Sequence, residues 1–186
     1  MASRTYFDLF GLEEKILLDE SSLRQKFLAM SKAAHPDFHR GAVAGEASVQ
    51  ASSELNSAFL TLKDFEKRLN YVISLYQPPQ HSDRETYKAP QTLLVELMDM
   101  HDLLLDYKHA QTDALQNRLN SAMMGLQSKM DAIDNDLKSS AAQFDVAPDF
   151  EQRKVFASDM KDLTLRKNYL RSLYRTIDET LNPSER

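Results

Sequence analysis

The residues of this chain best suited to chemistry lie in the stretch SKAAHPDFHRG, residues 31–41. Imidazole and carboxylate groups this close in sequence, on His35, Asp37 and His39, could converge on one metal ion. The other histidines lie where no paired spacing would complete such a site: His81, His101 and His109. We therefore expect neither a metal site nor a bound cofactor.

Other catalytic chemistry has less support in the sequence. The chain has no cysteine, which excludes disulfides, thiolate metal sites and cysteine nucleophiles. It has no glycine-rich phosphate-binding loop and no nucleophile elbow, and carboxylates scattered over helix faces are ordinarily solvated. We expect that the protein is not an enzyme and that it acts by binding other molecules.

The composition favours a helical protein. Only four glycines among 186 residues, with 42% hydrophobic residues, suit helices better than a β-sandwich, which needs more turn residues. The net charge of -5 argues against broad neutralisation of nucleic-acid phosphates. No apolar run approaches the roughly 20 residues that span a bilayer, and the N-terminus has no signal or transit peptide pattern. We expect a cytosolic protein or a trimmed mature form, with no nucleic-acid or membrane partner.

A helix and a loop must position the His-Pro-Asp triplet. Pro36 disfavours helical dihedrals in the residue before it, so the preceding helix ends at His35 and the triplet lies on a loop. Asp19 caps that helix, whose apolar face consists of Leu23, Phe27, Met30 and Ala34. The helix also carries basic residues with no acid between them: Arg24, Lys26 and Lys32. For three charges alone, a solvated helix face is the simpler interpretation.

The flanking segments complete a compact unit. Apolar spacing predicts a short helix over 5–10, a long helix over 46–63 and a fourth helix over 65–76. A proline-containing linker without periodicity follows at 77–90. The first domain is therefore expected to span 1–76.

The remainder of the chain, 91–186, has the pattern of a bundle of three antiparallel helices. Its apolar stripes are Leu93, Leu97, Met100, Leu104 and Tyr107; then Leu115, Leu119, Ala122, Leu126, Ile133 and Leu137; then Phe156, Met160, Leu163, Leu170, Tyr174, Ile177 and Leu181. The second stripe is interrupted at Lys129, where Met130 can fill the gap, and the third at Lys167. A loop over 139–149 is expected to join the second and third helices.

Some apolar residues of this bundle lie off the stripes. At about 100° per residue, Leu94, Val95 and Met98 point away from the first stripe, and acids border them at Asp99, Asp102 and Asp106. Tyr169 lies off its own stripe in line with Leu165 and Leu173. Burial of the first helix on two sides would explain this pattern. The alternative is an exposed apolar strip with an acidic rim, which is typical of a protein-docking surface.

The segments YFDLFGL, LLDESSLRQKFLAMSKAAHPDF and SSELNSAFLTLKDFEKRLNYVISL, in this order, resemble the J domain of the HscB (Jac-type) co-chaperones of iron–sulfur cluster assembly. The match covers the first 76 residues, and a linker followed by a three-helix bundle is also that family's architecture. The resemblance implies an all-α fold: a J domain at 1–76, built as a helical hairpin with two short flanking helices, a linker at 77–90, and a scaffold-binding three-helix bundle at 91–186.

The resemblance also implies partners for both domains. His35, Pro36 and Asp37 would engage a DnaK-type chaperone of the HscA kind and stimulate its ATPase. The basic residues Arg24, Lys26 and Lys32 would meet acidic surface on that chaperone. The bundle would hold the iron–sulfur scaffold IscU, through residues that coincide with the off-stripe set: Leu94, Val95, Met98, Asp99, Asp102 and Tyr169. The protein would deliver this scaffold to the chaperone.

The chain departs from the family at a few positions. Phe38 follows the triplet where many relatives have lysine, and Phe65 stands where proline is common, at the predicted start of the fourth helix. The zinc-binding cysteines of some eukaryotic relatives are absent, which favours a bacterial cytoplasmic protein over a processed mitochondrial matrix form. Two alternatives stay open: a J protein for a different client, and a non-catalytic helical adaptor in which the triplet is accidental.

Overall fold

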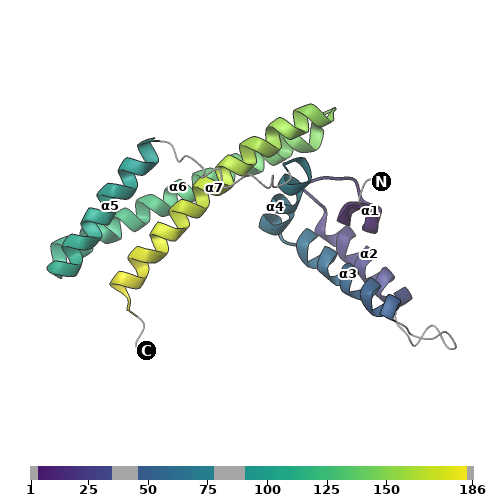
Figure 1. The fold of residues 1–186 in the computed structure, drawn as a ribbon, viewed down its shortest axis with the longest axis horizontal. Helices are drawn as coiled ribbons and strands as arrows, with labels where there is room; N and C mark the ends of the chain where they lie inside the picture. Colours follow the sequence, from purple (N-terminus) through teal and green to yellow (C-terminus); the bar gives the residue numbers. More distant parts are fainter. Residues whose placement is uncertain (1–3, 35–45, 78–90, 184–186) are drawn as a thin grey trace. The chain divides into compact units, whose positions relative to one another are not determined.

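A computed structural model describes residues 4–34, 46–77 and 91–183, with the side chains of 34, 46–49 and 91–93 excepted (Figure 1). The regular structure of these residues is entirely helical, and their seven helices are α1 (Tyr6–Phe10), α2 (Glu20–Ala34), α3 (Glu46–Leu62), α4 (Phe65–Tyr76), α5 (Gln91–His109), α6 (Asp113–Val146) and α7 (Phe150–Leu181). The predicted all-α class is confirmed for this part of the chain.

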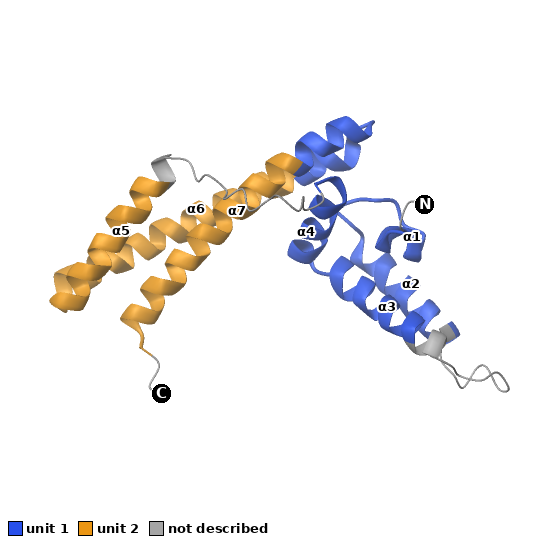
Figure 2. Ribbon diagram, viewed as in Figure 1, with its two compact units in different colours: residues 1–78, 141–157 blue, residues 79–140, 158–186 orange. Residues whose placement is uncertain are grey.

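The contacts divide the chain into two compact units (Figure 2). Unit 1 consists of residues 1–78 and 141–157, and unit 2 consists of residues 79–140 and 158–186. The helices α6 and α7 therefore contribute residues to both units. The apolar periodicity of the sequence does not indicate that residues 141–157 group with the N-terminal residues. The predicted domain limits stay a prediction.

The short helix α1 is fixed at both ends by local chemistry. Thr5 and Asp8 form a capping box: Asp8 N donates to Thr5 Oγ1 at 3.1 Å, and Thr5 N donates to Asp8 Oδ2 at 2.9 Å. Gly11 ends the helix in the left-handed conformation, with φ at 55°. Phe7 and Phe10 are buried, so the helix is anchored to unit 1 through its apolar side.

The helices α2 and α3 pack through the apolar face expected from the sequence. Leu23 and Leu62 are fully buried, and Phe27 stacks on Phe59 with ring centroids 4.1 Å apart. The start of α4 needs no proline, because Asp64 caps it by accepting a hydrogen bond from Lys67 N at 2.9 Å. The predicted limits of this helix, 65–76, agree with the structure.

A buried arginine links α4 to the loop before α2. Arg68 is 3% exposed, and its Nε donates to Ile16 O at 2.6 Å while a terminal nitrogen donates to Leu62 O. Desolvation lowers the pKa of the Arg68 guanidinium. The two carbonyl acceptors satisfy donors that would otherwise be buried without partners, which makes Arg68 a structural residue of unit 1.

The turn end of the α6–α7 hairpin belongs to unit 1 and contacts its N-terminal residues. Asp145 accepts hydrogen bonds from Ile16 N at 2.6 Å and from Leu17 N at 2.8 Å. The Tyr76 ring meets the edge of Phe144 at 5.2 Å and stacks on Phe150 at 5.0 Å. These contacts join segments that are far apart in the sequence.

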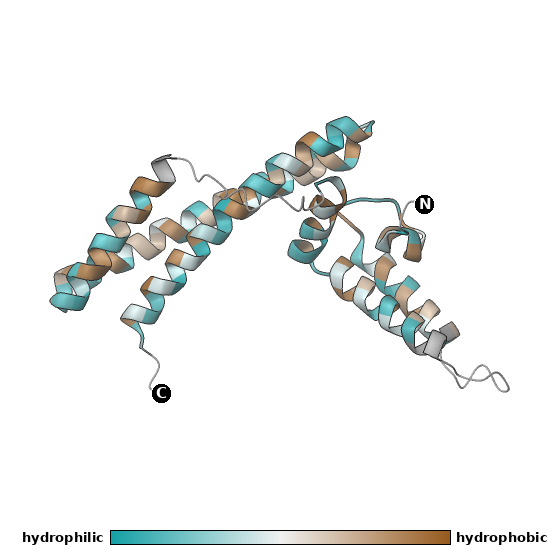
Figure 3. Cartoon of the chain, viewed as in Figure 1, coloured by the Kyte–Doolittle hydropathy of each residue, from teal (hydrophilic) through white to brown (hydrophobic). Residues whose placement is uncertain are grey.

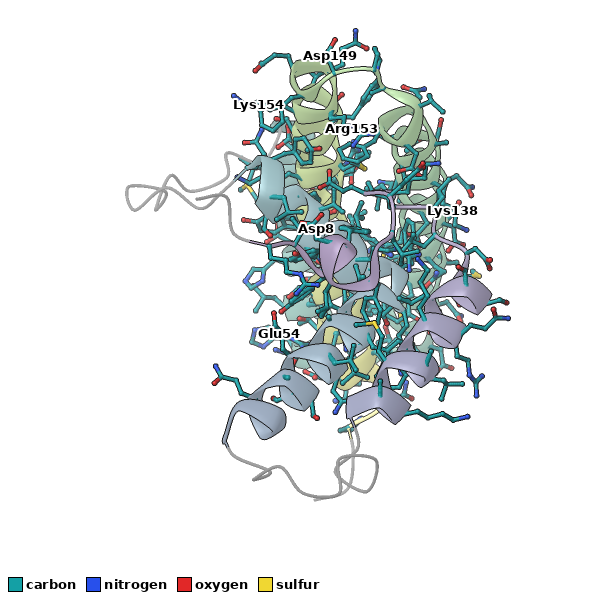
Figure 4. The ribbon with its side chains drawn as sticks, turned by 90° about the vertical axis from the view of Figure 1, so that its right-hand side faces the viewer. Asp8, Glu54, Lys138, Asp149, Arg153 and Lys154 are labelled. Atoms are coloured by element: carbon teal, nitrogen blue, oxygen red, sulfur yellow. The ribbon has the colours of Figure 1, made fainter. Side chains whose placement is uncertain are left out.

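A charged group completes this cluster of unit 1. The Tyr76 hydroxyl donates to Glu14 Oε1 at 2.5 Å, and an Arg153 nitrogen lies 3.5 Å from the same oxygen. The Arg153 guanidinium also lies over the Phe144 ring. Figure 4 shows Arg153 near the start of α7, where Asp149 caps the helix by accepting from Gln152 N at 2.8 Å.

The loop predicted over 139–149 is wrong. The helix α6 continues to Val146, because Ala141 and Phe144 extend its buried face and are fully buried in unit 1. The polar letters around residue 139 suggested a loop, but they occupy the exposed side of the same helix. The actual turn is confined to residues 147–149.

Unit 2 buries most of the predicted seam. Its core residues are Leu103, Leu104 and Tyr107 of α5; Leu119, Leu126, Met130, Ile133 and Leu137 of α6; and Met160, Leu170 and Ile177 of α7. Met130 is buried beside the exposed Lys129, as predicted. Lys167, which interrupts the third stripe, is buried, and its Nζ forms an ion pair with Asp134 Oδ1 at 2.5 Å. On α5, Leu97 and Met100 were predicted to be in the core but are only half-buried. Leu103, which was not in the predicted stripe, is buried.

Hydrophilic and hydrophobic residues are interspersed along the long helices (Figure 3). Within the described ranges, no helix combines the length and the apolar content that crossing a membrane would need.

Candidate functional site

The basic face of α2 is exposed because the opposite side of the helix packs within unit 1. Leu23 is fully buried and Phe27 is stacked on Phe59, so Arg24 and Lys32 fall on the solvent side and are exposed. Arg24 borders a hollow of about 690 Å³ between α2 and α3. Its other lining residues are Glu20, Ser21, Phe27, Leu28, Phe59, Lys63 and Asp64. This face therefore combines cations with exposed apolar surface.

Lys26 has a different environment from Arg24 and Lys32. It is half-buried, and its Nζ donates to Phe10 O at 3.0 Å and to Gly11 O at 2.7 Å. These carbonyls lie at the C-terminus of α1, where a cation satisfies acceptors that the helix leaves without partners. The structure thus gives the Lys26 ammonium an intramolecular role that the spacing of basic residues did not indicate.

The residues of the triplet, His35, Pro36 and Asp37, lie outside the described residues, as does His39. The helix that precedes them is described as far as Ala34. Among the residues that the structure does describe, no group of three or more histidine or acidic side chains is placed to hold a metal ion.

A groove between α5 and α7 gathers most of the predicted scaffold-binding residues. Its volume is about 620 Å³, within the range of about 300–1,000 Å³ of ligand sites. Leu94, Met98 and Asp102 line it from α5, and Tyr169 lines it from α7. The structure therefore brings together side chains that are more than sixty positions apart in the sequence.

The apolar side chains at this groove are exposed. Met98 is 67% exposed, Val95 is 57%, Leu94 is 46% and Tyr169 is 38%. Burial of α5 on two sides, the alternative that the sequence left open, is therefore wrong for these residues. Because Leu103, Leu104 and Tyr107 occupy the buried side of the helix, the helical period turns Leu94 and Met98 outward.

Val95 and Asp99 do not line this groove. Val95 is exposed beside it, and Asp99 lines a second, smaller hollow. Asp99, Asp102 and Asp106 are all exposed, so the apolar strip has an acidic border along α5. Such a border favours a partner whose docking surface is apolar and basic.

Several lining residues were not among the predicted ones: Leu97, His101, Leu104, Ser172, Leu173 and Thr176. Helical spacing had already aligned Leu173 with Tyr169, although Leu173 was not included in the predicted site. The same spacing could have added His101, which lies one turn after Met98. Leu97 was placed in the core stripe, and its half-buried position explains why it also reaches the groove.

Comparisons with known proteins identify similar sequences among co-chaperones. No family model matches the chain. A "Co-chaperone protein HscB homolog" of Vibrio cholerae is 36% identical over 103 residues, which are 53% of this chain and 58% of that protein. The homologue of the same name from Ralstonia nicotianae is 33% identical over 121 residues, which are 63% of this chain and 68% of that protein. The first match thus spans less than two thirds of its relative's length.

Two solved structures have a similar fold. The chaperone HscB from Vibrio cholerae has a TM-score of 0.51 and 24% identity, with 93% of this chain and 99% of that chain covered. The human co-chaperone protein HscB has a TM-score of 0.54 and 20% identity, with 92% and 83% covered. The likeness confirms the predicted fold class, a helical J domain with a C-terminal helical bundle.

Proposed function

The chain belongs to the HscB family of co-chaperones, and from this premise we propose that it stimulates the ATPase of a DnaK-type chaperone of the HscA kind and delivers the iron–sulfur scaffold IscU to it. Its role would be to support iron–sulfur cluster assembly and transfer. The observation that carries the proposal is the α5–α7 groove, where Leu94, Met98, Asp102 and Tyr169 lie together.

The chaperone-binding surface consists of His35, Pro36 and Asp37 together with the basic face of α2. The exposure of Arg24 and Lys32 supports this assignment, because both cations can reach an acidic partner. Lys26 belongs to the same surface, although its ammonium also caps α1. Contacts of this kind raise the association rate and weaken as salt is added. The hydrolysis itself is chemistry of the partner.

The scaffold-binding surface consists of Leu94, Val95, Met98, Asp99, Asp102 and Tyr169. Exposed apolar groups at a groove supply the area that a docked partner removes from water, about 25 cal/mol for each Å². Asp99 and Asp102 at the edge would orient a basic partner. Aromatic side chains are enriched among residues that dominate binding energy, which supports the inclusion of Tyr169.

Delivery follows from the presence of both surfaces on one chain. A scaffold bound to the bundle stays at a high effective concentration near the chaperone that the J domain engages. We place this activity in a bacterial cytoplasm, because the chain lacks the cysteines of some eukaryotic relatives. The alternative location is the mitochondrial matrix, with a processed form.

The test is the ATP turnover of the HscA-type chaperone, measured alone, with this protein, with the scaffold, and with both. We expect stimulation by this protein and a further increase when the scaffold is added. Stimulation without any effect or binding of the scaffold would indicate a J protein for another client. No effect on turnover would contradict the proposal and favour a helical adaptor.

A further inference from the structure

A second hollow lies next to the α5–α7 groove. It is formed by α5, α6 and α7 within unit 2, and its volume is about 190 Å³. The lining residues are Glu96, Leu97, Asp99, Met100, Ala122, Gly125, Leu126, Lys129, Leu170 and Leu173. Leu97 and Leu173 also line the larger groove, so the two hollows share walls.

Small residues of α6 create this hollow. Ala122 and Gly125 lie one turn apart on the helix, and a Cβ added at Gly125 would meet no atom within 4 Å. A glycine inside a long helix is unfavourable compared with alanine, and here no close contact requires it. The space beside Gly125 is therefore open, and the helical backbone at this position would also accept a residue with a side chain.

The size and lining of the hollow define what can enter it. An apolar cavity of about 150 Å³ holds a benzene ring, so this hollow has room for one aliphatic or aromatic side chain but not for a helix. Leu97, Met100 and Leu170 supply apolar walls. Glu96 and Lys129 form an ion pair of 2.8 Å at the rim, which leaves the exposed Asp99 as the additional charge there.

We propose that the hollow beside Gly125 is a second subsite for the scaffold, and that it receives one apolar side chain flanked by a basic residue. The inference rests on the proposed function, because it extends the same docking surface around α5. It also explains a division within the predicted set, since Asp102 lines the larger groove while Asp99 lines the smaller hollow. A partner that occupies the larger groove reaches the smaller one across Leu97.

Methionine methyl NMR on the full chain tests this proposal without a substitution. Met98 lines the larger groove, Met100 lines the smaller hollow, and Met30 on α2 serves as the control. On addition of apo scaffold, we expect the Met98 and Met100 resonances to shift while the Met30 resonance stays. A shift of Met98 alone would overturn the second subsite and keep the proposed function. If neither moves, the docking of the scaffold fails as a whole.

A pair of variants at one position gives a separate test. We expect Gly125→Leu to fill the hollow and to reduce scaffold affinity at least tenfold in calorimetry, while Gly125→Ala changes it less than twofold. Both variants replace a helical glycine, so neither should melt below the wild type. A folded Gly125→Leu variant with wild-type affinity would overturn the proposal. So would a Met100 shift that follows protein concentration without scaffold, because a second copy would then be the occupant.

Discussion

The exposed face of α2 and the α5–α7 groove differ in charge and in apolar content. The α2 face presents the exposed cations Arg24 and Lys32, and Arg24 borders a hollow with stacked aromatic rings. The groove presents Leu94 and Met98 beside Asp102. A cationic face attracts an acidic partner over a distance, and its contribution falls with salt. An apolar groove contributes through burial, which is short-ranged and less sensitive to salt. The difference indicates that the two surfaces serve different partners.

The largest expected effect comes from the triplet. We expect His35→Gln to abolish the stimulation of the chaperone's ATPase, because the triplet is the proposed trigger. Scaffold affinity, measured by calorimetry on the same variant, should stay at the wild-type level. Full stimulation by this variant would refute the role assigned to His35.

The next effect concerns the groove. We expect the double variant Leu94→Ala and Met98→Ala to weaken scaffold binding by about thirtyfold or more, since each substitution removes an apolar contact of about 1–2 kcal/mol. Both side chains are exposed, so the melting temperature should stay close to the wild type. The measurement is calorimetric titration of apo scaffold, accompanied by a thermal melt.

Leu105→Ala is the matched control for that double variant. Leu105 is 41% exposed on the same helix, but it lines neither the groove nor the smaller hollow. We expect it to bind the scaffold like the wild type. Equal losses in the control and in the double variant would contradict the assignment of the groove.

A smaller effect is expected on the stability of the fold, where Lys26 should differ from Arg24. Removal of its ammonium in Lys26→Ala leaves the carbonyls of Phe10 and Gly11 without their donor, at a cost of about 1–2 kcal/mol in the free energy of unfolding. Arg24→Ala should leave stability unchanged and reduce ATPase stimulation several-fold, with less effect at high salt. Urea unfolding and turnover at two salt concentrations check both parts. Equal stability of the two variants would argue against the capping role of Lys26.

The smallest effect is a titration in α1. Hydrogen bonds from the Thr5 backbone and side chain hold the pKa of Asp8 below its ordinary value of 3.8. The folded state therefore favours the charged form of Asp8. The resulting contribution to the stability of the fold is present above pH 3.8 and is lost as the pH falls through the lower pKa of the folded state. We expect carbonyl NMR to find this lowered pKa and Thr5→Ala to raise it. An unchanged Asp8 titration in that variant would contradict the capping box.

Local chemistry explains which parts of the fold could be predicted from the sequence. The apolar period located α4 at residues 65–76 without the expected proline, and Asp64 supplies the cap that replaces it. The same period identified Leu94 and Met98 as off-stripe residues, which the structure leaves exposed. The cap of α4 and the helical period both involve residues that are close together in the sequence.

The missed features depend on contacts between distant segments. Asp145 accepts hydrogen bonds from Ile16 and Leu17, and no periodicity connects residues more than one hundred positions apart. The helical continuation of α6 to Val146 depends on the burial of Phe144 against Tyr76. The hollow beside Gly125 likewise requires three helices in place before it exists. Tertiary packing, which overrides local propensity, decided these features.

A mixing experiment tests most directly the central claim that one chain carries both surfaces. The His35→Gln chain would keep the scaffold surface, and the Leu94→Ala, Met98→Ala chain would keep the chaperone surface. The measured quantity is the increase in chaperone ATPase turnover that the scaffold adds when both chains are present. Because coupling requires both surfaces on one molecule, we expect the mixture to lack this increase. An increase equal to that of the wild type would contradict the account.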